Sequence, residues 1–262
     1  MKFGVCRGVD ALEDIKTAAK AGFDYIETGF SGLARCSDEE FEAFAAALRE
    51  NNIRCETANG FLPRDYKVVG GEFDKEKVTA YIEKGMARGA QVGLKVVVFG
   101  SGKARAVPEG MEFAEAYKQL VYFLGEVAAP IAAKYGVTMV TEPLRKDETN
   151  IIHTVKEGVM LGAATGKSNV GGLGDIYHML GAGDTCEDVK ELKGNLLHAH
   201  ISNPVGKDGR KRLYPASAEE FDYKGFLEAL IFAGCERCSV EANCIDFAAE
   251  APVTAKLLKS LI

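Results

Sequence analysis

The feature that most constrains the fold of this chain is a unit that recurs eight times: a short apolar run, a polar turn and an amphipathic helical segment. The apolar runs cover residues 3–6, 23–27, 53–57, 94–99, 138–142, 169–175, 196–201 and 239–241. Each unit takes about 33 of the 262 residues, a normal length for a β/α repeat. Buried strands alternating with helices form parallel sheets, and eight repeats favour closure. We therefore predict an α/β protein, a single-domain (β/α)8 TIM barrel over residues 1–262.

The alternative architecture, an open doubly wound sheet, has little support. No G-x-G-x-x-G fingerprint follows the first apolar run. The weakest strand is the sixth, because Val170-Gly171-Gly172-Leu173-Gly174 is poor strand material by propensity. Its glycines have a possible use, which is to relieve crowding where the backbone approaches a metal or a substrate.

Several helix starts and stops can be read directly. The capping-box pattern, or its aspartate variant, begins at Asp10, Ser37, Thr154, Asp184 and Ser217. Three helices should stop at glycine, namely at Gly22, Gly136 and Gly234. In the helical segment after residue 112, Pro130 removes a backbone donor and should kink the helix.

Composition limits the partners. The net charge of −6 and the isoelectric point near 5.4 disfavour a nucleic-acid backbone as ligand. The densest basic cluster, residues 207–212, suits a small anion better than a duplex. No apolar run approaches the roughly 20 residues that span a bilayer, and an arginine at position 7 comes too early for a secretory signal. Seven scattered cysteines are typical of reduced thiols. We expect a cytoplasmic protein without a nucleic-acid or membrane partner, and homo-oligomerisation stays open.

Four polar residues close the last four apolar runs: Glu142, Asp175, His200 and Glu241. In a closed β/α barrel the carboxyl ends of the strands converge, so these side chains should meet at one mouth. Three carboxylates and one imidazole suit one divalent metal ion, with Mn²⁺, Mg²⁺ or Co²⁺ favoured and zinc possible. The alternative is that each residue merely caps a helix or pairs with a lysine.

Six segments carry a resemblance to a known family. They are Phe99-Gly100-Ser101-Gly102, Val140-Thr141-Glu142-Pro143-Leu144, Asp175-Ile176-Tyr177-His178, His198-Ala199-His200-Ile201-Ser202, the stretch 209–215 and Ser239-Val240-Glu241. The chain resembles the xylose isomerase-like barrels of the sugar isomerase/epimerase superfamily, which includes ketose 3-epimerases. The resemblance implies that Glu142, Asp175, His200 and Glu241 bind one divalent metal. It also implies that Glu142 and Glu241 flank the carbon that exchanges its proton, and that His178 contacts the substrate.

Other residues are candidates for binding the substrate, which we expect to be a small sugar or sugar phosphate. Arg210 and Arg212 follow the seventh strand and could hold a phosphate or a sugar hydroxyl. Ser101 lies in a glycine-rich turn able to cradle an oxyanion, and Asn59 lies just beyond the third strand. Ketose 3-epimerases typically place an arginine six residues after the metal-binding histidine, where this chain has Gly206.

His198 shares a strand face with His200 and should lie one layer deeper in the barrel. It is either a hydrogen-bonded core histidine or a group that supports the metal ligands.

The chemistry that suits such a site is proton transfer next to a carbonyl. A metal chelated by a carbonyl and a neighbouring hydroxyl stabilises an enediolate, and two carboxylates can remove and return the proton. We therefore predict a metal-dependent sugar, or sugar phosphate, isomerase/epimerase. The alternatives are an inosose-type dehydratase, an endonuclease IV-like phosphodiester hydrolase and a non-catalytic sugar-binding barrel.

Overall fold

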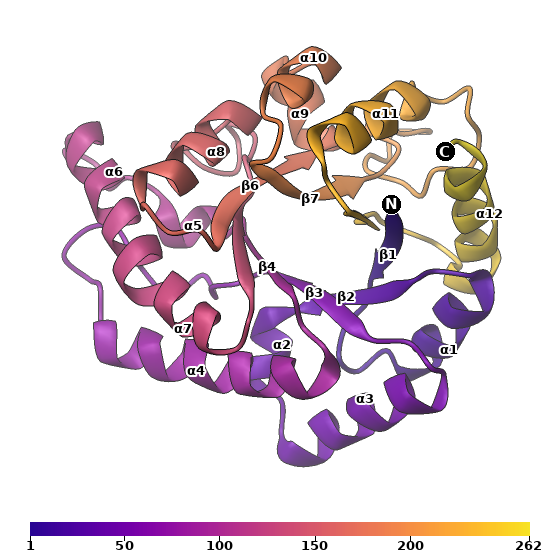
Figure 1. The fold of residues 1–262 in the computed structure, drawn as a ribbon, viewed down its shortest axis with the longest axis horizontal. Coiled ribbons are helices and arrows are strands. Elements are labelled where there is room, and N and C mark those ends of the chain that lie inside the picture. The colour runs from indigo at the N-terminus through magenta and orange to yellow at the C-terminus, as the bar shows by residue number, and fades with distance from the viewer.

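The computed structural model describes all residues, 1–262, and contains one closed parallel barrel in which the eight strands follow one another in chain order. Figure 1 shows the strands forming a ring with the helices outside it. The strands are β1 (Lys2–Cys6), β2 (Tyr25–Gly29), β3 (Cys55–Asn59), β4 (Val96–Phe99), β5 (Thr138–Thr141), β6 (Val170–Asp175), β7 (Leu196–Ile201) and β8 (Arg237–Val240). The barrel closes because β1 pairs with both β2 and β8. The predicted single-domain (β/α)8 TIM barrel is confirmed.

Helices fill every connection between strands and form the outer layer (Figure 1). They are α1 (Leu12–Ala21), α2 (Phe30–Arg35), α3 (Asp38–Glu50), α4 (Lys75–Val92), α5 (Gly102–Arg105), α6 (Phe113–Tyr122), η1 (Phe123–Ala128), α7 (Ala129–Lys134), α8 (Val155–Ala164), α9 (Ile176–Ala182), α10 (Cys186–Glu191), α11 (Tyr223–Ala233) and α12 (Phe247–Ser260). None of them combines the length and the apolar character needed to cross a membrane.

Strand β7 shows how two-residue periodicity separates the core from the site. Ala199 and Ile201 belong to the apolar layer between the sheet and the helices. The alternate residues, His198 and His200, point into the barrel, where both are completely buried. Val98 and Val140 belong to a small separate apolar cluster. Apolar and polar side chains therefore both contribute to the buried part of the barrel.

The predicted helix starts are partly confirmed. Ser37 and Thr154 form complete capping boxes before α3 and α8. The box before α10 begins one residue later than predicted, at Thr185. The pattern at Ser217 does not start a helix, because α11 begins at Tyr223 with Asp222 as its cap. The pattern at Asp10 also fails, since α1 begins after Ala11 without a side-chain cap.

Pro130 lies within a continuous helical segment that changes its hydrogen-bonding pattern. The segment runs from α6 through a π-helical turn, η1, into α7, where the proline occupies the first turn. A proline has no backbone N–H to donate to the preceding turn, and a local π-helical turn is one way in which a helix accommodates such a break. The structure thus has a π-helical turn just before the proline, and the predicted kink stays a prediction. Of the three predicted stops, Gly22 and Gly234 adopt left-handed conformations that end α1 and α11. Gly136 also has a positive φ, of 66°, but it lies one residue beyond Tyr135, the C-cap of α7.

The glycines of β6 have a different role from the predicted one. A Cβ atom at Gly172 would overlap Val159 of α8, and one at Gly171 would overlap Leu197 of β7. On the facing helix, Gly162 lies against the backbone of Gly171. Gly162 and Gly172 allow α8 to approach the sheet closely, and Gly171 makes room for Leu197, whereas a close approach of the backbone to a metal or substrate was expected. The prediction was wrong because propensity identifies crowding but not the element that causes it.

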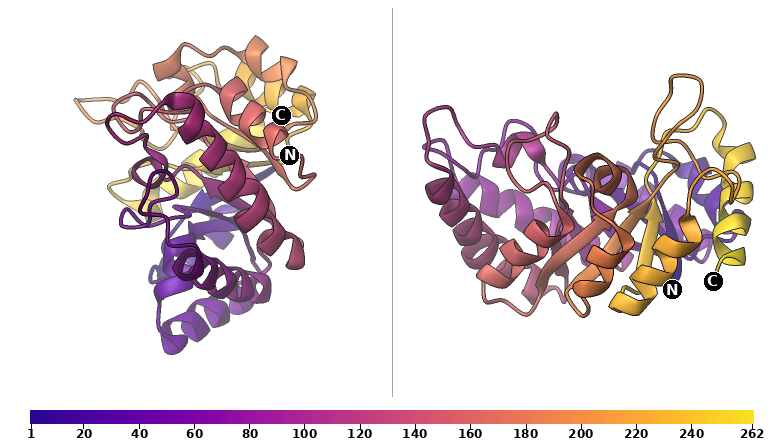
Figure 2. Two further views of the ribbon diagram at one scale, coloured as in Figure 1. Left: turned by 90° about the vertical axis from the view of Figure 1, so that its left-hand side faces the viewer. Right: turned by 90° about the horizontal axis from the view of Figure 1, so that it is seen from above.

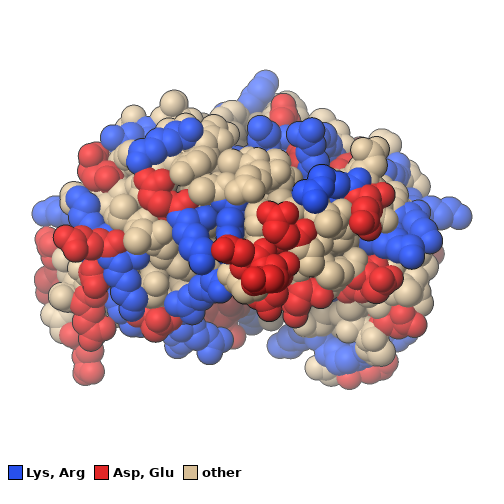
Figure 3. Space-filling model, turned by 90° about the horizontal axis from the view of Figure 1, so that it is seen from below, with Lys and Arg blue, Asp and Glu red and all other residues tan.

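The loops at the carboxyl ends of the strands form one mouth of the barrel. In the right panel of Figure 2 the connection between β7 and α11 is the orange loop that rises highest above the strands. Backbone hydrogen bonds between Lys207 and Arg210 and between Asn203 and Leu213 fold it into a hairpin. On the face drawn in Figure 3, acidic and basic side chains are interleaved.

Candidate metal centre

The four residues that close β5 to β8 meet at the mouth of the barrel. Glu142, Asp175, His200 and Glu241 each offer one potential ligand atom, and these atoms all lie within 4.8 Å of one another. The first three are buried and Glu241 is partly exposed. Four consecutive strands therefore bring together the donor set that the sequence predicts, in an arrangement compact enough for one ion.

Asp175 has its two carboxylate oxygens directed to different partners. It is the last residue of β6 and the N-cap of α9, so Oδ1 accepts hydrogen bonds from the backbone N–H groups of Tyr177, at 2.7 Å, and His178, at 3.4 Å. Oδ2 is thereby left to face the site, 3.7 Å from His200 Nδ1. Capping a helix and contributing to a metal site are thus compatible roles for this residue.

His200 lies at the centre of the cluster. Its Nδ1 atom is 3.0 Å from Glu142 Oε1, 2.9 Å from Glu241 Oε2 and 3.7 Å from Asp175 Oδ2. Burial disfavours the imidazolium, but Glu241 and Glu27 raise the pKa of His200 well above its ordinary value. Without an ion, the imidazolium therefore supplies positive charge to a strongly acidic site.

Glu142 lies directly after β5 and is positioned by its neighbours. A Cβ atom at Gly100 would overlap Glu142 Oε2, so the carboxylate needs a glycine at the end of β4. The fully buried guanidinium of Arg105 donates to the carbonyl oxygens of Phe99, at 3.0 Å, and Glu142, at 2.8 Å. Arg105 therefore links the ends of β4 and β5 through hydrogen bonds to their backbone.

Glu241 follows β8 and has a firm hydrogen-bond partner. Asn59, at the end of β3, donates to Glu241 Oε1 at 2.6 Å. Asn59 also lies close to the thiol of Cys6, with 3.7 Å between Nδ2 and Sγ. The residue predicted as a substrate donor is thus part of the cluster, where it orients one of the two glutamates.

Arg212 enters the cluster from the β7–α11 hairpin. Its Nη2 group donates to both Asp175 Oδ2 and Glu241 Oε2, and Nε donates to the carbonyl oxygen of Glu241 at 3.1 Å. The guanidinium also lies 5.2 Å from the centre of the Tyr177 ring. Arg212 has a left-handed backbone conformation, with φ of 55°. A loop residue held in this sparsely populated region suggests a functional constraint.

The other predicted substrate contacts lie at different distances from the cluster. His178 is buried, with Nε2 3.8 Å from Asp175 Oδ2 and Nδ1 accepting from the backbone N–H of Arg145 at 3.3 Å. Ser101 Oγ accepts from the backbone N–H of Leu62 at 2.9 Å and lines a neighbouring pocket of about 380 Å³. Arg210 is exposed at the hairpin turn and is not brought into the cluster.

Glu27 is a residue of the site region that the sequence analysis did not select. It lies within β2, is completely buried, and its carboxylate oxygens are 2.8 Å from both His198 Nε2 and His200 Nε2. Burial favours its neutral form, but the two histidines hold its pKa well below the ordinary value. The available signal was a carboxylate closing the apolar run 23–27, as at three of the four selected positions.

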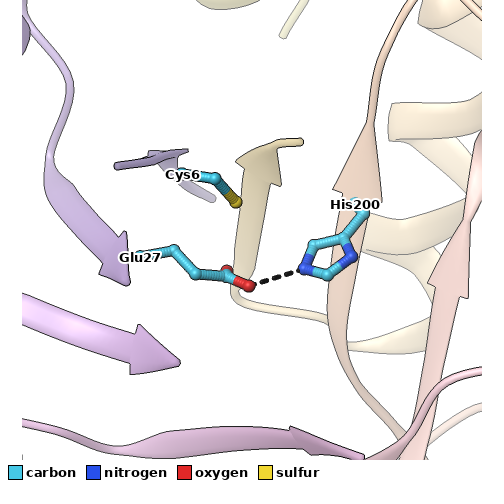
Figure 4. A group of neighbouring side chains, drawn as sticks. All are labelled: Cys6, Glu27 and His200. Atoms are coloured by element: carbon cyan, nitrogen blue, oxygen red, sulfur yellow. Dashed lines mark hydrogen bonds and ion pairs between the residues drawn. The ribbon is translucent and has the colours of Figure 1, made fainter. Parts of the chain in front are cut away.

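A second group of potential ligands consists of Cys6, Glu27 and His200, shown in Figure 4. A metal-binding cysteine has to lose its proton. Burial and the nearby Glu27 carboxylate raise the pKa of Cys6 well above its ordinary value. The group with three carboxylates is therefore the better candidate for a divalent ion.

The carboxylates of the main cluster differ in their electrostatic surroundings. Burial and the neighbouring Glu241 raise the pKa of Glu142. Burial would raise the pKa of Glu241 too, but His200 and Arg212 lower it. Arg212 and the nearby histidines likewise hold the pKa of Asp175 far below its usual range, against the effect of burial. The site is thus asymmetric, with Glu142 the most easily protonated of the three.

The fold and the cluster together define a class of protein: a parallel eight-stranded barrel with four potential metal ligands at the carboxyl ends of adjacent strands. The model of the xylose isomerase-like TIM barrel family matches residues 15–261. The chain belongs to this family, as the sequence resemblance implied.

Individual relatives are distant. D-psicose 3-epimerase of Agrobacterium fabrum is 25% identical over 193 residues, which are 71% of this chain and 65%, just under two thirds, of that enzyme. The solved structure of the apo form of 3-keto-D-glucoside 4-epimerase from E. coli has a TM-score of 0.80 at 22% identity, covering 99% of both chains. The IOLI protein with a bound zinc atom has a TM-score of 0.73 at 20% identity, covering 100% of this chain and 96% of that one. At these identities the structures show a shared fold.

Proposed function

We propose that this protein is a divalent-metal-dependent sugar, or sugar phosphate, isomerase/epimerase that acts by proton transfer at a carbon next to a carbonyl. The observation that carries the proposal is the pairing of two glutamates across one imidazole nitrogen. Glu142 Oε1 and Glu241 Oε2 lie 3.0 Å and 2.9 Å from His200 Nδ1. Two carboxylates that face one small space can act on opposite sides of a substrate bound between them.

The residues present fit a divalent ion. Glu142, Asp175, His200 and Glu241 would hold it, and an oxygen-rich set with one imidazole suits Mn²⁺, Co²⁺ or Mg²⁺, while zinc also accepts such ligands. When bound, the ion supplies Lewis-acid stabilisation of the negative charge that develops on a sugar oxygen as a neighbouring C–H proton leaves. The IOLI protein, which has a similar fold, was solved with a bound zinc atom, and this supports a divalent metal ion in the present protein.

The two glutamates would share the movement of the proton. The two carboxylate oxygens of Glu142 have different neighbours: Oε1 contacts His200, and Oε2 lies next to Gly100. We assign the removal of the proton to one glutamate and its return to the other, so that the configuration of the carbon can invert. Asn59 holds Glu241 Oε1 in place while Oε2 faces the centre of the site.

The substrate would be held by polar groups around this centre. Arg212 and His178 lie beside Asp175 and can donate to sugar hydroxyl groups or to a phosphate. Ser101 borders the neighbouring pocket, and the exposed Arg210 could reach only a substituent that extends out of the mouth. The names of two relatives, D-psicose 3-epimerase and 3-keto-D-glucoside 4-epimerase, support a carbohydrate as ligand.

The test is solvent-deuterium exchange. Protein stripped with a chelator and reloaded with Mn²⁺, Co²⁺ or Mg²⁺ is incubated in D₂O with ketoses, ketose phosphates and inososes, and the products are followed by NMR and mass spectrometry. We expect deuterium at a carbon next to the carbonyl, together with an epimer or an isomer, only when metal is present. Loss of water from an inosose would instead indicate a dehydratase. Absence of carbon-bound deuterium from every compound would refute the proposed chemistry.

A further inference from the structure

Glu27 lies across the barrel from the strand that supplies the histidine of the cluster. It belongs to β2, whereas His198 and His200 belong to β7, and the three side chains meet inside the barrel. Glu27 Oε1 is 2.8 Å from His200 Nε2 (Figure 4). Glu27 Oε2 is 2.8 Å from His198 Nε2. The hydroxyl group of Thr57 donates to Oε2 at 2.7 Å. No lysine or arginine is among these partners, so the carboxylate is held by two imidazoles and one hydroxyl group.

The orientation of Glu27 has a visible cause in the sheet. Cys6, Glu27 and Thr57 are register partners across β1, β2 and β3. The pairing of β2 with β3 shifts between Ile26 and Glu27, and such an irregularity re-aims side chains. It places the Glu27 carboxylate beside Thr57 and towards β7.

These contacts determine which nitrogen of His200 would be available to a bound metal ion. An ionised carboxylate only accepts hydrogen bonds, so the ring must present an N–H group at Nε2 to Glu27. The Nδ1 atom, which faces Glu142, Asp175 and Glu241, is then the nitrogen that can bind a metal. Histidines that bind metals generally donate their other N–H group to a carboxylate or carbonyl, which fixes the tautomer and the ring orientation.

His198 is linked to the same carboxylate. Its Nε2 atom contacts Glu27, while its Nδ1 atom is buried without a hydrogen-bond partner. The hydrogen-bonding capacity of this histidine is therefore directed only at Glu27. Together with Thr57, it restrains the carboxylate oxygen that does not contact His200.

We infer that Glu27 is a positioning residue for the metal centre: held by Thr57 and His198, it fixes the His200 ring and reserves Nδ1 for the ion. The inference rests on the metal site of the proposed function and adds a residue outside the four proposed ligands. Of the two alternatives for His198, it favours the one in which this histidine supports the metal ligands.

The experiment compares Mn²⁺ affinity with stability. Metal-free wild-type protein, Glu27→Gln and Glu56→Gln are titrated with Mn²⁺ by calorimetry, and their thermal unfolding is measured. Glu56 is a matched control, because it is also a buried, paired barrel glutamate, but it contacts Lys2 and Arg237 at the opposite ends of the strands. We expect Glu27→Gln to weaken Mn²⁺ binding by about 10- to 100-fold and Glu56→Gln to change it less than about twofold. A folded Glu27→Gln protein with wild-type affinity would overturn the inference.

A second measurement needs no variant and applies even if Glu27→Gln does not fold. Long-range ¹H–¹⁵N NMR spectra of Zn²⁺-loaded wild-type protein report which nitrogen of each imidazole carries the proton. We expect His200 to be protonated at Nε2 and metal-bound at Nδ1. Metal binding through Nε2 would overturn the inference. Proton exchange into sugars by the wild-type protein would be unaffected by that result, so the two proposals can fail separately.

Discussion

Arg212 and Asp175 form an ion pair in which the arginine contacts Oδ2, the carboxylate oxygen that faces His200. The other oxygen of Asp175 caps helix α9. The Arg212 guanidinium thus contacts an oxygen that would otherwise be available to a metal ion, and it also contacts Glu241. Arg212 and a bound metal ion would therefore compete for the carboxylates of Asp175 and Glu241.

The first prediction concerns this competition. Arg212→Gln removes a positive charge beside the ligands, so metal-free protein should bind Mn²⁺ roughly tenfold more tightly, since a nearby like charge opposes the ion by at least about 1 kcal/mol. The melting temperature of the metal-free protein should fall, because the carboxylates lose a counter-charge. Arg210→Gln, in the same hairpin but exposed, is the control and should change neither quantity. Weaker Mn²⁺ binding by Arg212→Gln would show that the arginine supports the ion.

The second prediction separates catalysis from binding. Glu142→Gln and Glu241→Gln each remove one acid–base group, so the rate of deuterium incorporation should fall by about 10²- to 10⁴-fold. The rate has to be measured at Mn²⁺ concentrations that saturate each variant, because both residues are proposed ligands. A variant that is fully loaded with Mn²⁺ and exchanges at the wild-type rate would remove that glutamate from the mechanism.

A third prediction concerns pH and the opposite end of the barrel. Glu56 pairs with Lys2 at 2.6 Å and with Arg237 at 2.7 Å. Burial raises the pKa of Glu56, but these two cations lower it overall. Because its pKa is lower in the folded state, ionised Glu56 stabilises the folded protein at pH values above its unfolded-state pKa of about 4.3. This stabilisation is lost as the pH falls through the folded-state pKa. The free energy of unfolding of the wild-type protein should therefore exceed that of Glu56→Gln by about 1–3 kcal/mol at pH 7.

The measurement is the free energy of unfolding in urea at pH 7 and at pH 4 for both proteins. The difference between them should shrink at the lower pH. A difference that is the same at both values would show that the charge of Glu56 does not contribute.

A fourth prediction tests the packing of α8 against β6. Gly172→Ala places a methyl group onto Val159, and overpacking of this kind costs about 1–3 kcal/mol. Gly174→Ala is the control in the same strand, because its Cβ atom would meet Leu196 at an ordinary 3.4 Å. In urea, the free energy of unfolding should be lower for Gly172→Ala than for the wild-type protein, and it should change by less than about 0.5 kcal/mol for Gly174→Ala. Equal losses would indicate that strand propensity, rather than contact with α8, determines both.

The sequence was sufficient for the barrel because its signals are local and repeated. Each strand is a short apolar run, and the carboxyl ends of parallel strands necessarily converge. That rule alone brings Glu142, Asp175, His200 and Glu241 together. Helix starts were less predictable, since Asp222 and Ser217 carry equally acceptable caps and tertiary packing decides between them.

The remaining features depend on contacts between distant segments. Glu27 and His200 are 173 positions apart, and their contact requires both barrel closure and a register shift in β2. The route of Arg212 into the cluster depends on how a polar hairpin folds over the mouth. Neither contact has a periodic signature in the chain, so the surroundings of the proposed ligands were less predictable than those four residues themselves.

The most direct test of the central claim is a crystal structure of the Mn²⁺-loaded protein with an anomalous difference map. We predict one strong peak at the mouth of the barrel, within coordination distance of Glu142, Asp175, Glu241 and Nδ1 of His200. A peak at the group formed by Cys6, Glu27 and His200, or no ordered peak at the ends of β5 to β8, would contradict it.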